Sequence, residues 1–321
     1  MDTLSQLIDL ARPQASLDLR CLLSGAFEVD HAPLEAGIAP FHLVLGGACQ
    51  IETASGAQLA LQAGDFMLFP RGAAHRLRDA KGAAGGAPMV LSHDGMLPLR
   101  RNDGVHAGVE EPARHAAEVD LLCGRFVYAP GPSALLLNAL PDPFHVSLGE
   151  EQTLGALQTL IALMRTEAQR RQPGALAIVT ALSHALFAMA LRAHSNRSAA
   201  TSGILALLAD SRLSASVQGM LSAPERAWTI AELGELAAMS RATYARHFNE
   251  RAGVTVMDFL TQIRMMIACD LLRRTQRSAA EIGEAVGYQS EAAFGKAFAQ
   301  SVGVTPGRYR RRPQEDDASP S

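Results

Sequence analysis

The sequence predicts an α+β protein of two domains: an N-terminal antiparallel β-barrel with a helical hairpin, and a C-terminal domain made only of helices. Three observations lead to this prediction. Short apolar runs between Gly- and Pro-containing turns fill the first part of the chain, and apolar positions then recur at helical spacing. Near the C-terminus one two-helix pattern occurs twice. At 321 residues the chain is long enough for two cores.

The N-terminal part begins with a short amphipathic helix that carries Leu4, Leu7 and Ile8. Turns such as Gly46-Gly47 and Pro70-Arg71-Gly72 then separate short strand-like segments. These segments are residues 41–45, 59–61, 66–69 and 121–127. Short strands with frequent turns are typical of an antiparallel barrel or sandwich.

A change to helical spacing follows residue 150. One helix ends near Arg170-Arg171, and Pro173-Gly174 separates it from a second, strongly apolar helix. Residues 178–191 of that second helix are apolar around more of the circumference than one packed face requires, so we expect a homodimer interface. The same segment is too short to span a bilayer, and the N-terminus lacks the features of a signal peptide.

A small, polar segment after this hairpin is typical of an interdomain linker. The predicted organisation is a regulatory and dimerisation domain over residues 1–194, a linker over 195–206, and a helical domain over 207–312. A disordered acidic tail over 313–321 completes the chain.

The duplicated pattern near the C-terminus predicts two copies of a helix, a tight turn and a second helix. Thr229 with Glu232, and Ser278 with Glu281, match the capping box that starts a helix. In the second helix of each copy, two aromatic residues stand four positions apart, as expected for a buried face. These aromatic residues are Tyr244 and Phe248 in one copy, and Phe294 and Phe298 in the other.

Small and basic residues occupy the opposite face of both second helices. Small residues let a helix approach base edges closely, and Arg or Lys beside them can bind guanine. The pattern therefore predicts binding of double-stranded DNA through two helix-turn-helix units. The candidate DNA-binding residues are Ser240, Arg241, Ala242, Thr243, Ala245 and Arg246 in the first unit, and Ser290, Glu291, Ala292, Ala293 and Lys296 in the second.

This part of the chain resembles the AraC/XylS DNA-binding domain. The residues that carry the resemblance include Ser240, Tyr244, Arg246, Phe248, Gly253, Phe259, Arg264, Ala268, Ile282, Gly287, Phe294, Phe298, Gly303, Pro306 and Tyr309. The resemblance implies a seven-helix domain that places two recognition helices in successive major-groove segments. It also implies a transcription regulator, expected to be an activator, with RNA polymerase as a partner. Val256 stands where many members carry proline.

Charge supports a DNA-binding C-terminal half. Residues 204–312 contain 14 Lys and Arg against 10 Asp and Glu, although the whole chain has a net charge of −3. Basic charge is therefore concentrated where phosphate neutralisation would require it. Four scattered cysteines without paired spacing are typical of a reducing compartment, so we expect a cytoplasmic protein without a membrane segment.

The barrel contains a second resemblance. Gly64, Pro70, Gly72 and His75 have the spacing of the second cupin motif, and together with Phe41-His42 they resemble a cupin-like sensor domain. In metal-binding cupins His75 would be a ligand, joined by a His-x-His pair and a glutamate. Here His42 stands alone and no such glutamate follows. We therefore predict no metal, no cofactor and no catalytic residues. His42 and His75 are expected to hydrogen-bond inside the barrel or to line an effector pocket, and the alternative for them is adventitious or regulatory metal binding.

Cys21 and Cys123 are candidate redox residues because they stand at positions similar to those in a branch of this family that senses reactive chlorine species. Arg20 is next to Cys21 in sequence and could favour its thiolate. We expect Cys21 in a segment that precedes the barrel and Cys123 on a later strand. The alternative for every cysteine is a small buried side chain without reactivity.

The sequence thus favours a DNA-binding regulator controlled by a redox or small-molecule effector. Two alternatives belong to other classes of protein. One is a cupin-type metal-dependent enzyme with a helical appendage, and the other is a scaffold that binds a second regulator through its helices. Bound metal with turnover would favour the enzyme, and loss of DNA binding in the isolated C-terminal half would favour the scaffold.

Overall fold

The computed structural model describes residues 2–81, 87–93, 97–102, 118–129, 131–147, 154–170, 172–197 and 203–311. Two compact units are present. The β-rich unit consists of Pro13–Tyr128 and Leu140–Arg197. The helical unit consists of Met1–Arg12, Ala129–Ala139 and Ser198–Ser321. The expected acidic tail, residues 313–321, lies outside the described residues.

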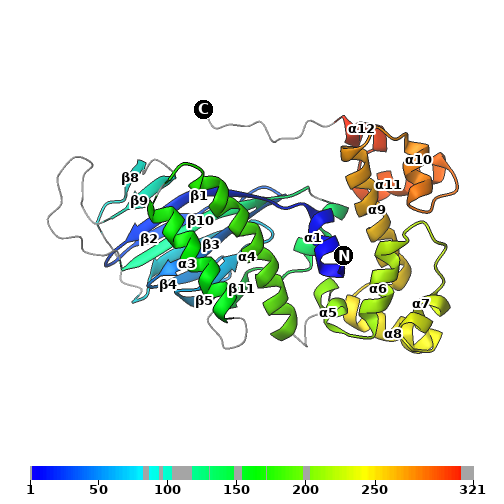
Figure 1. Ribbon diagram of the computed structural model, residues 1–321, viewed down its shortest axis with the longest axis horizontal. Coiled ribbons are helices and arrows are strands. Elements are labelled where there is room, and N and C mark those ends of the chain that lie inside the picture. The colour runs from blue at the N-terminus through cyan, green and yellow to red at the C-terminus, as the bar shows by residue number, and fades with distance from the viewer. Residues whose placement is uncertain are drawn as a thin grey trace. The chain divides into compact units, whose positions relative to one another are not determined.

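Two sheets form the β-rich unit (Figure 1). Its core contains buried side chains from both sheets. The larger sheet has the order β11-β6-β3-β10-β1-β9-β8, and the smaller has the order β2-β7-β4-β5. The strands are β1 (Gln14–Leu23), β2 (Glu28–His31), β3 (Ile38–Gly46), β4 (Ala48–Thr53), β5 (Gln58–Gln62), β6 (Asp65–Leu68), β7 (His75–Asp79), β8 (Val90–His93), β9 (Pro98–Arg101), β10 (Val119–Val127) and β11 (Phe144–Ser147). The predicted α+β fold with a β-rich first domain is confirmed.

The position of β1 corrects one prediction. Cys21 does not precede the barrel, because β1 lies inside the larger sheet between β10 and β9. The β1–β10 pair is antiparallel and the β1–β9 pair is parallel, the one parallel pairing among the described strands. Tight turns in the sequence marked strands that pair with their neighbours in the chain. No tight turn joins β1 to β9 or to β10, because both strands are far from β1 in the sequence.

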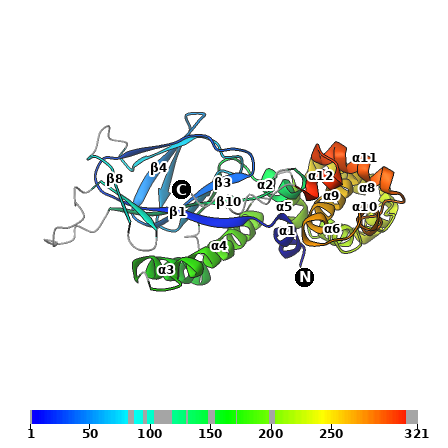
Figure 2. The ribbon, with the colours of Figure 1, turned by 90° about the horizontal axis from the view of Figure 1, so that it is seen from above.

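The predicted helical hairpin covers one face of the larger sheet (Figure 2). It consists of α3 (Leu154–Arg170) and α4 (Ala175–Arg197). Arg20 fixes the hairpin to the sheet: its guanidinium binds both carboxylate oxygens of Asp120 at 2.8 and 2.9 Å and donates to the Ala168 carbonyl of α3 at 3.1 Å.

Helix α4 is longer than the predicted apolar segment. By length and composition alone its residues Ala175–Ser195 would suit a membrane span, a property that core helices of soluble proteins share. The linker expected over 195–206 also differs from the structure. Ser195 is still helical, and a new helix already begins at Ile204.

Eight helices lie within the described residues 203–311 of the helical unit, one more than the AraC/XylS resemblance implied. They are α5 (Ile204–Ala209), α6 (Leu213–Ser222), α7 (Ile230–Leu236), α8 (Arg241–Ala252), α9 (Val256–Arg274), α10 (Ala279–Ala285), α11 (Glu291–Val302) and α12 (Pro306–Arg310). Asp210 lies between the first two, and its carboxylate accepts from the amides of Arg212 and Leu213 just before and at the start of α6.

The duplication seen in the sequence is a structural duplication. Both capping boxes form, at Thr229 with Glu232 and at Ser278 with Glu281. Each short first helix also carries a glycine against the aromatic residue of the second helix. A Cβ at Gly234 would stand 3.4 Å from Tyr244 Cβ, and a Cβ at Gly283 would stand 3.0 Å from Phe294 Cβ. The missing side chain therefore allows the two helices of each unit to pack closely.

The helical unit also contains two segments from outside the predicted C-terminal domain. They are α1 (Thr3–Ala11) and the pair η1 (Pro132–Ala134) and α2 (Leu135–Asn138). Arg12 pairs with Asp270 of α9 at 3.3 Å, and Gln218 of α6 donates to Gln6 of α1 at 3.2 Å. The domain boundary expected at residue 194 therefore assigns these two segments to the other domain. The sequence of such a short segment does not indicate which domain it packs against.

The turns of the two units differ at one residue. Gly287 ends its helix at φ 84°, whereas the matching position of the first unit holds Ala238 at φ 52°. An L-residue in this region loses about 1–2 kcal/mol. Ala238→Gly should therefore raise the free energy of unfolding by about 1 kcal/mol. Ala237→Gly is the control, because Ala237 has φ −91° and a buried methyl. Urea denaturation should show it to be destabilising. If both variants destabilise equally, Ala238 is not strained.

Candidate functional site

The second helices of the two units, α8 and α11, present matching surfaces. Along both helices three exposed residues are followed by a buried aromatic residue, a half-buried small residue and an exposed cation. The cations are Arg246 and Lys296. Arg246 is 75% exposed and makes only a 4.0 Å contact with Glu250. Within the described part of the chain Lys296 makes no ion pair. Both cations are therefore available to a partner.

Caps and aromatic anchors hold these surfaces in place. Ser240 and Ser290 accept from the amides of Thr243 and Ala293 at the helix starts. Tyr244 is fully buried and donates to Ser216 Oγ at 2.9 Å. Helix α8 packs near the start of α9 through Phe248 and Phe259, whose rings lie 5.4 Å apart.

Helix α11 packs against the second half of α9, in a cluster that includes Cys269, Leu272, Phe294 and Phe298. Helix α9 therefore holds α8 and α11 at two different places along its length of about 28 Å. All the candidate DNA-binding residues of the sequence are exposed except Ala245, which is half-buried. Their contact with DNA stays a prediction.

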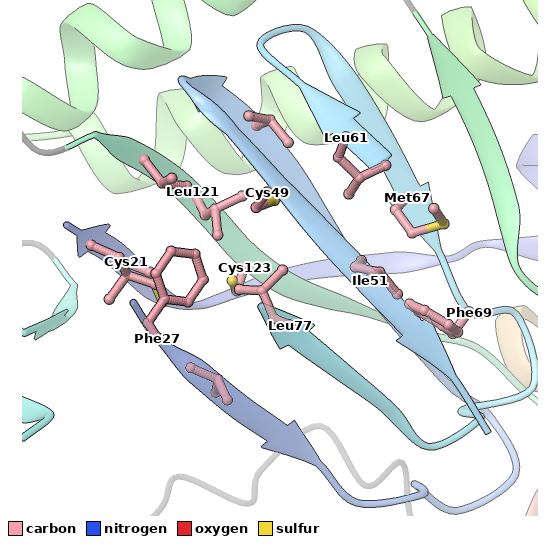
Figure 3. Packing of buried hydrophobic residues seen from close by; sticks show 14 residues of the cluster. Cys21, Phe27, Cys49, Ile51, Leu61, Met67, Phe69, Leu77, Leu121 and Cys123 are labelled. Carbon is pink, nitrogen blue, oxygen red and sulfur yellow. The ribbon is translucent and has the colours of Figure 1, made fainter. Parts of the chain in front are cut away.

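The second candidate site is a buried thiol pair in the β-rich unit. Cys21 and Cys123 lie on adjacent strands, β1 and β10, and their side chains are hydrogen-bonded. Cys21 pairs with Leu121 and Cys123 with Leu19, so the two cysteines are diagonal neighbours on one face. Figure 3 shows both in the cluster between the sheets. The two segments thus lie side by side, as a disulfide would require.

Arg20 is not the cation that lowers the pKa of Cys21. Successive residues of a strand point to opposite faces, and Arg20 is committed to Asp120 on the outer face. Arg100 is the cation near Cys21, because the pairing of β9 with β1 sets Arg100 beside Cys21. The hydrogen bond with Cys123 and the charge of Arg100 lower the pKa of the Cys21 thiol, against the effect of burial. The same hydrogen bond and burial raise the pKa of Cys123 well above its ordinary value.

Three histidines adjoin the thiol pair. His42 Nδ1 is 3.1 Å from Cys123 Sγ, and His42 Nε2 is 2.7 Å from His75 Nε2. The His42–His75 bond joins the larger sheet to the smaller. His31 stacks on His75 with centroids 4.5 Å apart, and Phe69 stacks on the other face at 3.8 Å. Burial lowers the pKa of His75 to about 4 and lowers that of His42 well below its ordinary value.

Ring nitrogens of His31, His42 and His75 lie within 4.8 Å of one another, so the cluster has to be tested as a metal centre. Two nitrogens bound to one Zn²⁺ would be about 3.3 Å apart, from the tetrahedral angle and ordinary bond lengths. The Nε2 atoms of His42 and His75 are closer, at 2.7 Å. The His31 and His75 planes differ by only 7°, so their lone pairs do not converge. His42 and His75 are arranged as a hydrogen-bonded pair on which His31 stacks, and this geometry is not that of a Zn²⁺ centre.

Sequence reasoning missed His31 and Arg100. Neither belongs to a motif, and only the pairing of β2 with β7 and of β9 with β1 brings them to the cluster. Cys49 lies in the same core but differs from the pair, because burial raises its pKa to about 12. Cys49 is therefore a matched unreactive thiol.

The buried histidines predict acid sensitivity of the β-rich unit. The pKa of His75 is about 4, against 6.5 ordinarily, so the unfolded chain binds the proton more tightly. Stability from this group is fully present above pH 6.5 and is lost as the pH falls towards 4. The loss is about 3 kcal/mol for full protonation. Urea denaturation of the full chain at pH 7 and pH 5 should show it, and His75→Gln should flatten the dependence. Equal stability at both pH values would contradict the prediction.

Comparison with known proteins decides the family. The cupin family model matches residues 2–196, and a helix-turn-helix domain model matches residues 233–312. An HTH-type transcriptional regulator of Haemophilus influenzae is 32% identical over 97% of this chain and 99% of its own length. The chain belongs to the AraC family of transcriptional regulators. This AraC-family regulator is therefore a DNA-binding protein and not a cupin enzyme.

Two other relatives of this AraC-family regulator also match over nearly their whole length. The HTH-type transcriptional regulator MtrA of Neisseria gonorrhoeae is 31% identical over 97% of this chain and 98% of its own. The RCS-specific HTH-type transcriptional activator RclR of Escherichia coli K12 is 29% identical over the same shares. The AraC-family regulator thus shares both domains with these relatives.

Proposed function

We propose that this AraC-family regulator is a cytoplasmic, homodimeric activator whose response to reactive chlorine species begins at Cys21 and Cys123. In this proposal residues 1–194 receive the signal and residues 207–312 bind promoter DNA. RNA polymerase is the partner expected from the family resemblance. The name of the relative RclR, an RCS-specific activator, supports both the activating role and the oxidant.

The single observation that carries the DNA-binding part is the matched surface of α8 and α11. Both helices expose their N-terminal turn and one cation, and both are held on the same long helix, α9. Exposed residues at the start of a recognition helix are those that reach base edges in the major groove. Arg246 and Lys296 are proposed to read bases, with the remaining candidates beside them.

Genome-wide mapping of bound DNA tests this part. The bound regions should share one sequence motif with two separate conserved blocks, one for each helix-turn-helix unit. Enrichment without a shared motif would mean that the chain binds DNA through phosphates alone.

The oxidant response is supported by the thiol pair itself. The two thiols are in contact and one is made more acidic by its neighbours, which is the arrangement of an attacking and a resolving cysteine. A Cys21–Cys123 disulfide would join two central strands diagonally. The strands β1 and β10 would have to shift, and α3 would shift with them through Arg20 and Ala168. We propose that this shift changes the dimer.

The homodimer is supported by apolar residues on the outer hairpin. Leu163 of α3 and Leu176 and Ile178 of α4 are 43%, 44% and 42% exposed. Ile178→Glu should convert the dimer to a monomer, because it would bury a charge in the contact. Leu91→Glu is the control, since Leu91 is 67% exposed but lies on β8. Sedimentation of both variants measures the effect. A wild-type monomer at micromolar concentration would end this part of the proposal.

A further inference from the structure

The thiol pair and two histidines form one line of hydrogen bonds across the core. Cys21 bonds to Cys123, Cys123 Sγ to His42 Nδ1 at 3.1 Å, and His42 Nε2 to His75 Nε2 at 2.7 Å. The line ends at the carbonyl oxygen of Ala73, 2.9 Å from His75 Nδ1.

That carbonyl fixes the direction of every bond. A carbonyl can only accept, so His75 Nδ1 carries a proton. His75 is neutral at pH 7 because its pKa is about 4, and its Nε2 is therefore an acceptor. His42 Nε2 must then donate, and as neutral His42 has only one proton, its Nδ1 has a free lone pair. In the reduced pair Cys123 donates its one proton to the Cys21 thiolate; once Cys21 is oxidised, the thiol of Cys123 can donate to that lone pair instead.

Disulfide formation needs such an acceptor. Cys21 has the lowered pKa and is the thiol that meets the oxidant. Cys123 must then attack the oxidised sulfur, yet the raised pKa of Cys123 keeps it protonated at neutral pH. A buried thiol in this state reacts only if a neighbouring base removes its proton.

We infer that His42 is the proton acceptor for Cys123 when the disulfide closes, and that His75 is the positioning residue that keeps His42 in the accepting tautomer. The inference rests on the proposed oxidant response. It gives a new role to the two histidines at the cupin positions: they accept and hold the proton of the Cys123 thiol.

The reaction balances with hypochlorous acid as the oxidant. The Cys21 thiolate attacks chlorine to give a sulfenyl chloride and hydroxide, and hydroxide takes up the proton that Cys21 released. Cys123 sulfur then attacks Cys21 sulfur, the S–Cl bond breaks, and chloride leaves. The proton of Cys123 moves to His42 Nδ1. Two thiols lose two electrons and chlorine gains them, with disulfide, water, chloride and one proton as products.

His75 is the better holder of this proton. His42 is the more deeply buried, with 1% of its surface exposed against 5% for His75, so a positive charge is less favourable on His42. As His42 Nδ1 gains a proton, its Nε2 proton can pass to His75 Nε2. The other charged or titratable groups that act on the line are Arg100 of β9, Asp120 of β10, Asp18 of β1, and His31 of β2.

The test follows disulfide closure in full-length reduced protein. Two equivalents of hypochlorous acid are added, because sulfinic acid requires a second two-electron oxidation; N-ethylmaleimide stops the reaction at intervals, and mass spectrometry measures the Cys21–Cys123 disulfide and Cys21 sulfinic acid. At pH 7, His42→Gln should slow the disulfide by about 100-fold and His75→Gln by about 10-fold. Unresolved Cys21 should proceed to sulfinic acid in both variants. The matched control is His31→Gln, which removes an imidazole of the cluster that lies outside the line.

The pH profile separates proton transfer from packing. In His42→Gln the rate should rise about tenfold per pH unit from pH 7 to 9, as Cys123 must ionise unaided, while the wild type stays flatter. Equal rates in wild type and His42→Gln, equal slowing by His31→Gln, or stoichiometric Zn²⁺ in the purified protein would each overturn the inference. If His42→Gln does not fold, His75→Gln carries the same test. A wild type that forms no such disulfide removes the proposed oxidant response and the inference together.

Discussion

Replacing Arg246 or Lys296 by alanine should weaken binding to the specific promoter site by about 1–3 kcal/mol, a loss of about 5- to 150-fold. Each cation is exposed, stands two residues after a buried aromatic residue, and occupies the same position in its helix-turn-helix unit. Each should therefore lose contacts to a different groove segment. Electrophoretic mobility shifts at fixed salt measure the change.

Arg274→Ala is the matched control for these variants. Arg274 belongs to the same compact helical unit, but it lies at the end of α9 and pairs with Asp270 at 3.5 Å. It should change specific binding little. Binding to unrelated DNA should fall less than specific binding in Arg246→Ala and Lys296→Ala. An equal loss on every sequence would mean that these side chains contact only phosphate.

Replacing Cys21 or Cys123 by serine should abolish the transcriptional response to hypochlorous acid. The two sulfurs form the hydrogen-bonded pair of the β-rich unit, and loss of either one prevents the disulfide. A promoter fusion measures the response in each variant. Basal DNA binding of the reduced variants should stay unchanged, because the pair lies in the β-rich unit.

Cys49→Ser is the control for the cysteine variants. Cys49 is buried in the same cluster, and its pKa is raised to about 12, so its thiol should not react. The Cys49→Ser variant should respond like the wild type. An unchanged response in Cys21→Ser and Cys123→Ser would instead place the signal in a small molecule bound by the β-rich unit.

The duplicated helical units could be predicted from sequence because their signals are local. Caps such as Thr229 with Glu232 and aromatic pairs four residues apart act within a single helix or turn. The strands of the β-rich unit were harder. Tight turns marked the edges of β3, β5 and β6, but β1 has neighbours far away in the chain, so its place in the sheet had no signal.

The thiol–histidine cluster shows where prediction ended. Cys21, Cys123, His42 and His75 could each be nominated as single residues, but their contacts depend on strand register. A shift of one residue would turn Cys123 away from His42. The expectation that Arg20 could favour the Cys21 thiolate failed for a related reason, because sequence neighbours on a strand face opposite sides.

The most direct test of the regulator is a hydroxyl-radical footprint of the purified protein on a promoter that it binds in the cell. If α8 and α11 both read DNA, each DNA-binding domain should protect two patches on one face of the duplex, about one helical turn apart. Arg246→Ala should remove protection from one patch and Lys296→Ala from the other. A single protected patch, or the same patch lost in both variants, would contradict reading by two equivalent helices.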